Sequence, residues 1–331
     1  MSKGFTNLGN TCYMNAALQC LSHIPHLSLD CSDFIKCIKK RDPENNSDII
    51  KEWLNLQQKV WKGNKDTVST LPLLKEFIRS CNNENIVFQS FNQNDTTDFL
   101  NTFMDLLHNS IKRKVSITIT GEPKNKYDRL KLESIKSWKN FFESNYSHII
   151  EKFHSKLLSI TSCPHCNYYT TNHEPIMTID LPLKETHTSI YDCLDEFIKE
   201  ETLDTNNTWK CDRCNRKVQP HKKLNFWELS PVLIISIKQF RLNKKMNKHI
   251  QFPEELDMKN YCINNNKTDL SYTLYGLCIH KGDLNGGHYY AACRDDKDNL
   301  WRIHNDTNVN TINIRNVLNE TPYCLFYIRD N

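Results

Sequence analysis

The sequence lacks several features that would place it in a class at once. Its 331 residues include only 8 glycines, and no run approaches the ~20 apolar residues that a membrane span requires. The formal net charge of +4 is too small to indicate a general affinity for nucleic acid. No secretory signal pattern precedes the first motif, which starts almost at the N-terminus. We therefore expect a globular protein without a membrane or nucleic-acid partner.

Cysteine is abundant, with 14 residues, yet the spacing shows no disulfide framework. Four cysteines form two C-x-x-C pairs, and Cys12 belongs to the motif near the N-terminus. The others are interpreted as reduced thiols, mostly small buried side chains, which places the chain in the cytosol, the nucleus or both. These are Cys20, Cys31, Cys37, Cys81, Cys193, Cys262, Cys278, Cys293 and Cys324.

Cys12 lies just after a glycine turn, at the start of a predicted amphipathic helix. The apolar positions of this helix follow the helical period up to Pro25, at Met14, Ala17, Leu18 and Leu21. The first turn of a helix has unpaired N–H groups and a partial positive charge. Because this environment favours thiolate over thiol, Cys12 is predicted to be a nucleophile with a stabilised thiolate.

A histidine and its orienting partner lie far downstream of Cys12. His288 follows two glycines and opens a strand, and Asn305 and Asp306 follow a strand that begins near Trp301. A cysteine, a histidine base and an Asn or Asp orienter at such distances are typical of a papain-like hydrolase.

The strand that His288 opens and the strand that Asn305 ends are predicted to form a β-hairpin around a polar turn. A loop of two or four residues places Asn305 opposite His288 and Ala292 opposite Trp301. A three-residue loop places Asp306 opposite His288 instead. The sequence does not fix the loop length, so both registers stay open at this point.

The remaining pattern is helical in the first half of the chain and β-rich in the second. Further helices are expected over 49–61, 71–81, 95–107 and about 132–153, with a polar connection over 112–129. Strands are expected over 157–160, 178–181, 232–237, 271–279, 288–294, 300–304 and 324–328. The pattern predicts an α+β fold.

The two C-x-x-C pairs predict a metal site. Cys163 and Cys166 form one pair and Cys211 and Cys214 the other, so two knuckles supply four thiolates for a tetrahedral zinc ion. Such a closed site is structural, not catalytic. The 44 intervening residues exceed the usual zinc-ribbon spacing. A disulfide pair is disfavoured by the reducing compartment, and a nucleic-acid zinc ribbon by the low net charge.

Together these segments resemble the ubiquitin-specific proteases. The matching motifs occur in the family's order across essentially the whole chain: Gly4 to Asn15, Gln93 to Leu100, the two C-x-x-C pairs, Gly286 to Tyr289 and Trp301 to Asp306. The resemblance implies a papain-like α+β fold with thumb, palm and zinc-binding β fingers in a single catalytic domain, 1–331. Its approximate parts are a helical thumb (1–110), a connection and helix (111–155), the fingers with palm strands (156–240) and the palm with the catalytic His and Asn/Asp (241–331).

The resemblance also assigns roles to the catalytic residues. It implies a thiol-dependent ubiquitin C-terminal hydrolase, a deubiquitinating protease that cleaves isopeptide or peptide bonds after the C-terminal glycine of ubiquitin through a thioester. Cys12 is then the nucleophile, His288 the base and Asn305 the preferred orienter, with Asp306 as a nearby second carboxylate. Asn7 is expected to stabilise the oxyanion, and Asn10 is the competing residue for that role.

Substrate-binding residues follow from the same resemblance. Gln93, Asp95 and Asp98 are expected to line the channel for the basic ubiquitin tail, and Asp98 stands where the family usually has Glu. Gly286, Gly287 and Tyr289 are expected at the gate that admits the terminal Gly-Gly.

The resemblance further implies one structural zinc ion, no organic cofactor, ubiquitin and ubiquitinated proteins as partners, and a monomer. Two alternatives remain: a protease for a ubiquitin-like modifier, and a catalytically silent ubiquitin-binding module. A nucleic-acid-binding zinc ribbon is a more distant one.

Overall fold

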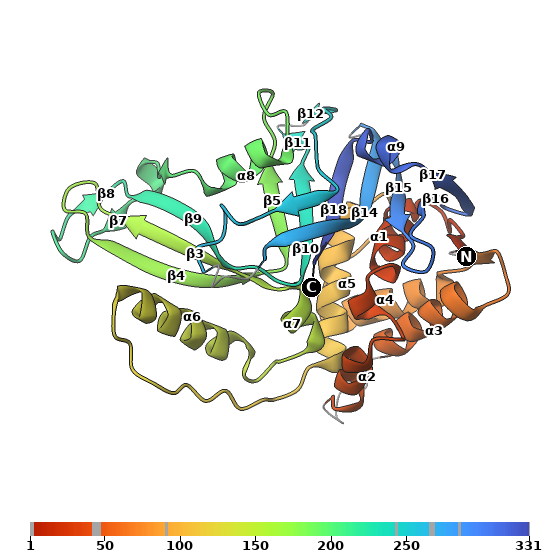
Figure 1. Cartoon of the computed structure of the whole chain (residues 1–331), viewed down its shortest axis with the longest axis horizontal. Helices are drawn as coiled ribbons and strands as arrows, with labels where there is room; N and C mark the ends of the chain where they lie inside the picture. The colour runs from red at the N-terminus through yellow and green to blue at the C-terminus, as the bar shows by residue number, and fades with distance from the viewer. Residues whose placement is uncertain are drawn as a thin grey trace.

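A computed structural model of the chain describes residues 3–41, 48–89, 92–241, 244–264, 269–283 and 286–330. Figure 1 shows helices α1 to α5 gathered at one end, beside a large sheet, and a second sheet that extends away from it. The helices are α1 (Cys12–Ser22), α2 (Ser32–Lys39), α3 (Ile49–Lys62), α4 (Leu71–Asn83), α5 (Thr96–Ile111), α6 (Lys126–Phe142), α7 (His148–Phe153), α8 (Ile190–Ile198) and α9 (Ile314–Leu318).

Helix α1 is the central element of the helical part. Every one of its residues is buried, and it packs against both α5 and strand β15 (Gly287–Arg294). The chain turns into α1 through Gly9 and Asn10, whose φ angles of 98° and 54° lie in the left-handed region that glycine and asparagine tolerate best. The predicted helix after the glycine turn is therefore present.

Helix α5 begins where its sequence predicts. Asp95 is the N-cap, and its Oδ1 accepts a hydrogen bond of 2.6 Å from the backbone N–H of Thr97. The apolar stripe of the helix faces the helical core, where the rings of Phe99 and Phe103 stack with centroids 5.6 Å apart. Helices α3 and α4 also match their predicted ranges closely, whereas α2, α8 and α9 were not predicted.

The helix predicted over 132–153 is wrong as a single element. It is divided into α6 and α7, because Tyr146 leaves the helical path and pairs with Arg113 in an isolated bridge. Ser147 then caps α7 by accepting a hydrogen bond of 3.2 Å from the N–H of Ile150. The polar connection is also shorter than predicted, since α6 begins at Lys126, after an Asn125 cap.

The large sheet has the strand order β17-β16-β15-β14-β18-β10-β5, with β13 paired to β14. All its pairs are antiparallel except β10 with β5. The bounds are β5 (Thr178–Pro182), β10 (Val232–Lys238), β13 (Glu255–Asp257), β14 (Ser271–Gly282), β15, β16 (Trp301–Asn305), β17 (Asn308–Ile312) and β18 (Pro322–Arg329). Each strand predicted in this region is present.

Both faces of the large sheet are buried, as alternation along β10 shows. Val232 and Ile234 belong to the core shared with the helices, whereas Leu233 and Ile235 belong to a second core under α8. The strands that carry His288 and Asn305 are therefore fixed from both sides.

A second sheet has the order β4-β3-β9-β6 and forms the extension visible in Figure 1. Its strands are β3 (Ser155–Ser162), β4 (Tyr169–Ile176), β6 (Glu201–Thr202) and β9 (His221–Glu228), and α6 packs on β4. Short two-stranded pairs complete the fold: β1 (Gly4–Phe5) with β2 (Thr67–Val68), β7 (Trp209–Lys210) with β8 (Lys217–Val218), and β11 (Phe240–Arg241) with β12 (Lys244–Lys245). The predicted α+β class is confirmed.

In the described ranges, none of the helices combines the length and the apolar character that crossing a membrane requires.

Candidate active site

Cys12 is the first residue of α1 and its side chain is buried. The preceding Thr11 is the N-cap, but its hydroxyl points into the loop, where it accepts a hydrogen bond from the N–H of Leu8 (2.9 Å) and donates one to Oδ1 of Asn7 (3.3 Å). Within the described residues, no side chain caps this helix. The first N–H groups of α1 therefore remain oriented toward the region around Cys12 without a capping oxygen.

The surroundings of Cys12 oppose the predicted thiolate. Burial raises the pKa of Cys12 above its ordinary value. A backbone hydrogen bond at Tyr289 lowers the pKa, but the charge of Asp306 raises it further. The helix N-terminus is outweighed, so the neutral thiol is favoured and a base must remove its proton.

His288 and Asn305 meet across two adjacent strands of the large sheet. Nε2 of His288, at the start of β15, lies 2.6 Å from Oδ1 of Asn305, at the end of β16. An amide oxygen only accepts, so Nε2 carries the proton and Nδ1 of the neutral ring is the basic nitrogen. Helix α1 packs on β15, but within the described residues no hydrogen bond joins Cys12 to His288.

The strand register differs from both predicted registers. Ala292 pairs with Ile303, not with Trp301, and Arg294 pairs with Trp301. The connection is thus six residues long, because Asp295 closes it with backbone bonds to Leu300 and Asn299.

The observed pairing moves by two positions from the register that placed Asn305 opposite His288. A shift of two keeps every side chain on its face of the sheet. Asn305 is therefore a diagonal neighbour of His288, close enough for the hydrogen bond that they form.

Asp306 faces the helical part of the molecule. Its carboxylate accepts hydrogen bonds from Nδ2 of Asn7 (2.9 Å) and from Nδ2 of Asn15 (2.8 Å). Its φ of 51° turns the chain directly after β16, and its carbonyl accepts from the N–H of Phe5. Sequence reasoning missed Asn15, although a buried asparagine within the apolar helix α1 is an unusual feature. Asp306 thus joins Asn7 to the strand that carries Asn305, and Asn10 lies exposed in the turn before α1.

The two acidic residues of α5 differ in their surroundings. The carboxylate of Asp95 is occupied by the N-terminus of its own helix and by the hydroxyl of Tyr323. Asp98 is exposed. Partial desolvation of its carboxylate, and next the charge of Asp95, raise the pKa of Asp98. Asp98 is the better placed of the two for a cationic ligand.

The glycines beside His288 have different surroundings. A Cβ on Gly287 would lie 2.1 Å from Nε2 of His280, so this position excludes any side chain. A Cβ on Gly286 would come no closer than 3.9 Å to the Gln93 amide. That amide lies 3.5 Å from the carbonyl of Gly287, and Tyr289 is buried against the ring of His280. Gln93, Gly286, Gly287 and Tyr289 thus lie together next to His288.

The four predicted metal ligands gather at the end of the second sheet. Sγ of Cys163 lies 3.8 Å from that of Cys214, and Sγ of Cys166 lies 3.5 Å from that of Cys211. All four sulfurs lie within 4.8 Å of one another. A tetrahedron with a metal–sulfur distance of about 2.3 Å separates its sulfurs by about 3.8 Å, so this donor set fits one ion. The pairs follow β3 and β7, which explains the long spacing between them.

The chain matches known proteins over its whole length. The sequence model of the family described as ubiquitin carboxyl-terminal hydrolase covers residues 3–327. Ubiquitin carboxyl-terminal hydrolase 2 of Homo sapiens is 30% identical over 339 residues, which cover 98% of this chain and 54% of the relative. Usp2 of Drosophila melanogaster is 28% identical, over 98% of this chain and 34% of its own length. A probable ubiquitin carboxyl-terminal hydrolase of Acanthamoeba polyphaga mimivirus is 27% identical, over 99% of this chain and 90% of its length.

Solved structures show the same arrangement. The SAGA Ubp8/Sgf11/Sus1/Sgf73 DUB module bound to ubiquitin aldehyde matches with a TM-score of 0.77 and 26% identity, over 100% of this chain and 70% of that chain. A Ubp8 variant of the same module, bound to monoubiquitin, matches with a TM-score of 0.74 and 26% identity, over 100% of this chain and 69% of that chain. The chain spans between a third and about half of the Drosophila and human relatives. The chain belongs to the ubiquitin carboxyl-terminal hydrolase family.

Proposed function

We propose that the chain is a thiol-dependent deubiquitinating protease that cleaves the bond after the C-terminal glycine of ubiquitin. One observation carries the proposal. Cys12 begins a buried helix that packs on the strand of His288, whose ring is held by Asn305. A nucleophile, a base and an orienting group on three packed elements form the arrangement that acyl transfer needs.

The first half of the reaction forms a thioester. Nδ1 of His288 takes the proton of the Cys12 thiol, and Asn305 holds the ring by its Nε2–H. The sulfur attacks the carbonyl carbon of the terminal glycine. The imidazolium then gives its proton to the leaving amine as the C–N bond breaks. In the second half, His288 takes a proton from water, the hydroxide displaces the sulfur, and the thiol and a free carboxylate result.

The negative oxygen of each tetrahedral intermediate needs donors that are already in place. Nδ2 of Asn7 has two protons, and the bond to Asp306 uses one of them. The other proton and the uncapped N–H groups of α1 supply the oxyanion site. Asp306 acts as a positioning residue for Asn7, not as a second partner of His288, and Asn10 ranks below Asn7.

Recognition of the substrate tail uses the residues around His288. The exposed Asp98 attracts the basic tail, and the Gln93 amide together with Gly286 and Tyr289 contacts the Gly-Gly end. The solved relatives bound to monoubiquitin and to ubiquitin aldehyde support ubiquitin as the ligand. Asp95 contributes mainly through the position of α5.

The cysteine cluster is proposed to hold one zinc ion with Cys163, Cys166, Cys211 and Cys214 as ligands. Thiolate sulfur suits zinc, and four protein ligands leave no open position, so the ion would stabilise the end of the second sheet. The thumb, fingers and palm would act as one catalytic unit, with approximate bounds as predicted from the sequence. A monomer in the cytosol or nucleus, without an organic cofactor, membrane or nucleic-acid partner, remains part of this proposal.

Turnover tests the proposal. Ubiquitin with a fluorescent amine on its C-terminal carboxyl group should release the amine with the wild-type protein and not with Cys12→Ala. The same amide of a ubiquitin-like modifier that ends in Gly-Gly should show a much lower kcat/KM. A higher kcat/KM for the modifier would assign the enzyme to that modifier, and no turnover of either amide would indicate a silent binding module.

A further inference from the structure

A second cluster of metal-ligating side chains lies inside the molecule, away from the four finger cysteines. His23, Cys293 and His304 each place one ligand atom within 4.8 Å of the others, and all three are buried. They come from three elements: His23 is the C-cap of α1, Cys293 lies in β15 and His304 lies in β16. The same three elements carry the nucleophile, the base and its orienting residue.

The imidazoles of this cluster have ring nitrogens that the protein satisfies only weakly. Nδ1 of His23 lies 2.7 Å from the carbonyl oxygen of Gln19 and donates to it. Its Nε2 makes no hydrogen bond of normal geometry among the described residues, and the ring interacts with the thiol of Cys293. The His304 ring interacts with the backbone of Lys3, but neither of its nitrogens makes a hydrogen bond of normal geometry within the described part of the chain. Buried polar atoms are almost always well partnered, so this weakly bonded group of side chains points to a ligand that is not part of the chain.

The donor chemistry indicates the kind of ligand. Two imidazoles and a thiol are the set that binds zinc and related metals. Metal–nitrogen distances of about 2.0 Å and a metal–sulfur distance of about 2.3 Å separate the donors by about 3.5 Å, which small side-chain rotations reach from the observed spacing. Sγ of Cys20 lies 3.9 Å from Sγ of Cys293 and offers a further thiol from α1. The Gln19 carbonyl orients His23 in the way that outer hydrogen bonds orient metal-binding imidazoles.

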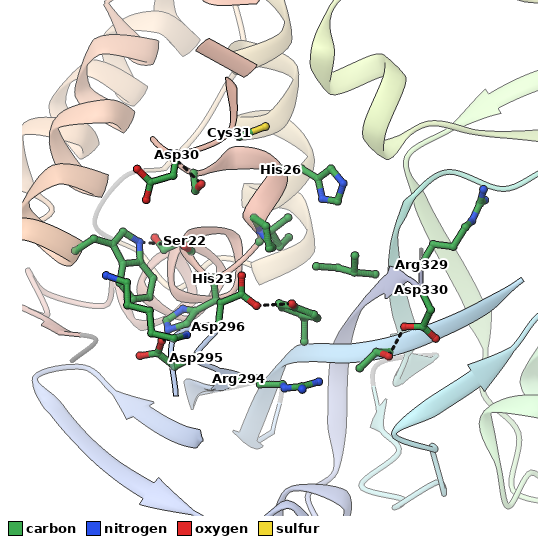
Figure 2. A pocket seen from close by; sticks show the side chains of 18 residues that line it. Ser22, His23, His26, Asp30, Cys31, Arg294, Asp295, Asp296, Arg329 and Asp330 are labelled. Atoms are coloured by element: carbon green, nitrogen blue, oxygen red, sulfur yellow. Dashed lines mark hydrogen bonds between the residues drawn. The ribbon is translucent and has the colours of Figure 1, made fainter. Parts of the chain in front are cut away.

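A cavity reaches one member of the cluster. It has a volume of about 790 Å³, and its lining includes His23 but neither Cys293 nor His304. Figure 2 draws the side chains that line it. Its wall also carries the carboxylates of Asp30, Asp295 and Asp296, together with cationic side chains such as Arg294. None of the proposed catalytic residues lines this cavity. A cation could therefore enter beside His23 without passing through the active site.

We infer that His23, Cys293 and His304 bind a second metal ion of the zinc class, with Cys20 as the fourth donor. The ion would fix the C-terminal end of α1 to β15 and β16. Cys12 lies eleven residues before His23, about 16 Å along the helix. The ion would therefore have a structural role: it would hold α1, which begins at Cys12, against the two strands that carry His288 and Asn305.

Zinc counting tests this site independently of activity. The full chain is incubated with zinc chloride, passed over a chelating resin and weighed by non-denaturing mass spectrometry. We expect about two ions on the wild type and about one on His304→Phe, which keeps a planar ring but removes both ligand atoms. His154→Phe is the matched control, because His154 is a largely buried histidine that belongs to neither cluster of metal-ligating residues, and the variant should keep two ions. Cys211→Ser combined with Cys214→Ser should keep the inner ion alone.

The number of zinc ions bound by the wild-type chain is the first test of the inner site. One ion on the wild type, lost with the finger cysteines, would overturn the inference. A count of two that His304→Phe leaves unchanged would also overturn it, because the second ion would then lie elsewhere. If His304→Phe does not fold, His23→Asn takes its place and should likewise lose one ion. If the inner site binds zinc, a chelator should lower the thermal unfolding midpoint of the Cys211→Ser, Cys214→Ser variant. The chelator should have a smaller effect on the same variant that also carries His304→Phe.

Discussion

The carboxylate of Asp306 accepts a hydrogen bond of 2.9 Å from the side-chain amide of Asn7, across 299 positions of the sequence. The bond joins the loop before the catalytic helix to the turn after the strand of Asn305. A second amide, that of Asn15, holds the other carboxylate oxygen at 2.8 Å. Asp306 therefore has a structural partner on each oxygen, and its effect on the oxyanion site should pass through Asn7.

This relationship predicts non-additive losses of activity. Asn7→Ala should lower kcat by about 10²–10³-fold with little change in KM, because the amide acts on the transition state. Asp306→Ala should lower kcat by a smaller factor, since Asp306 orients that amide and does not itself donate to the oxyanion. The double variant should be no slower than Asn7→Ala alone in steady-state hydrolysis of a ubiquitin amide. Multiplying losses would show that Asp306 acts separately.

The pH dependence of Cys12 alkylation follows from its buried position. Burial and the charge of Asp306 raise the pKa of Cys12, so its reaction with iodoacetamide should have a midpoint above that of an ordinary thiol. Asp306→Asn removes a negative charge that disfavours the thiolate, which should move the midpoint to lower pH. Peptide mass spectrometry follows Cys12 among the other cysteines. Asp98→Asn is the control and should leave the midpoint in place; a wild-type midpoint below the ordinary value would contradict the account.

Substitutions of Asp95 and Asp98, at the start of α5, should affect different properties of the protein. Asp98→Lys should raise KM for ubiquitin substrates by about 3- to 10-fold and leave stability unchanged, because this side chain is exposed. Asp95→Ala should lower the free energy of unfolding by about 1 kcal/mol or more, because it removes the N-cap of α5 and the partner of Tyr323. Kinetics and denaturant unfolding on both variants test this. Unchanged cleavage by Asp98→Lys would remove Asp98 from substrate recognition.

Acid should destabilise the fold through buried histidines such as His154. Burial lowers the pKa of His154 to about 4, below the value of about 6.5 in an unfolded chain. Between these values the unfolded state binds a proton that the folded state does not, so the free energy of unfolding falls as the pH falls. At pH 5 this one residue accounts for about 2 kcal/mol.

The His154→Phe variant checks this linkage by denaturant unfolding at pH 7 and pH 5. The loss of stability between the two values should be about 2 kcal/mol smaller than in the wild type. His249→Gln, at an exposed histidine, should retain the full wild-type loss. Equal losses in the wild type and His154→Phe would place the acid sensitivity elsewhere.

Local patterns predicted most of the elements, because their signals are short-range. The Asp95 cap and the apolar stripe of α5 lie within one helix, and the strands around Val232 and Leu325 are continuous apolar runs. The division of α6 from α7 depends instead on Tyr146 pairing with the distant Arg113, a contact that no local pattern reveals.

The residues of the candidate site were proposed from the sequence, but their contacts could not be. The alternation of side chains along the strands placed His288 and Asn305 on one face of the sheet, even though the predicted loop lengths were wrong. The helix N-terminus suggested a thiolate, but burial of Cys12 and the charge of Asp306 raise the pKa of the thiol and act against it. The burial of Cys12 and its closeness to Asp306 both depend on long-range packing. The imidazoles of His23 and His304 were missed for the same reason, since only the fold brings them together.

Covalent capture tests the central claim most directly. The zinc-loaded, reduced protein is mixed with ubiquitin that carries a thiol-reactive electrophile at its C-terminus, and the intact mass is measured for the wild type and Cys12→Ala. The account predicts one ubiquitin adduct on the wild type and none on the variant. No adduct on a folded wild-type sample, or an adduct on both proteins, would contradict it.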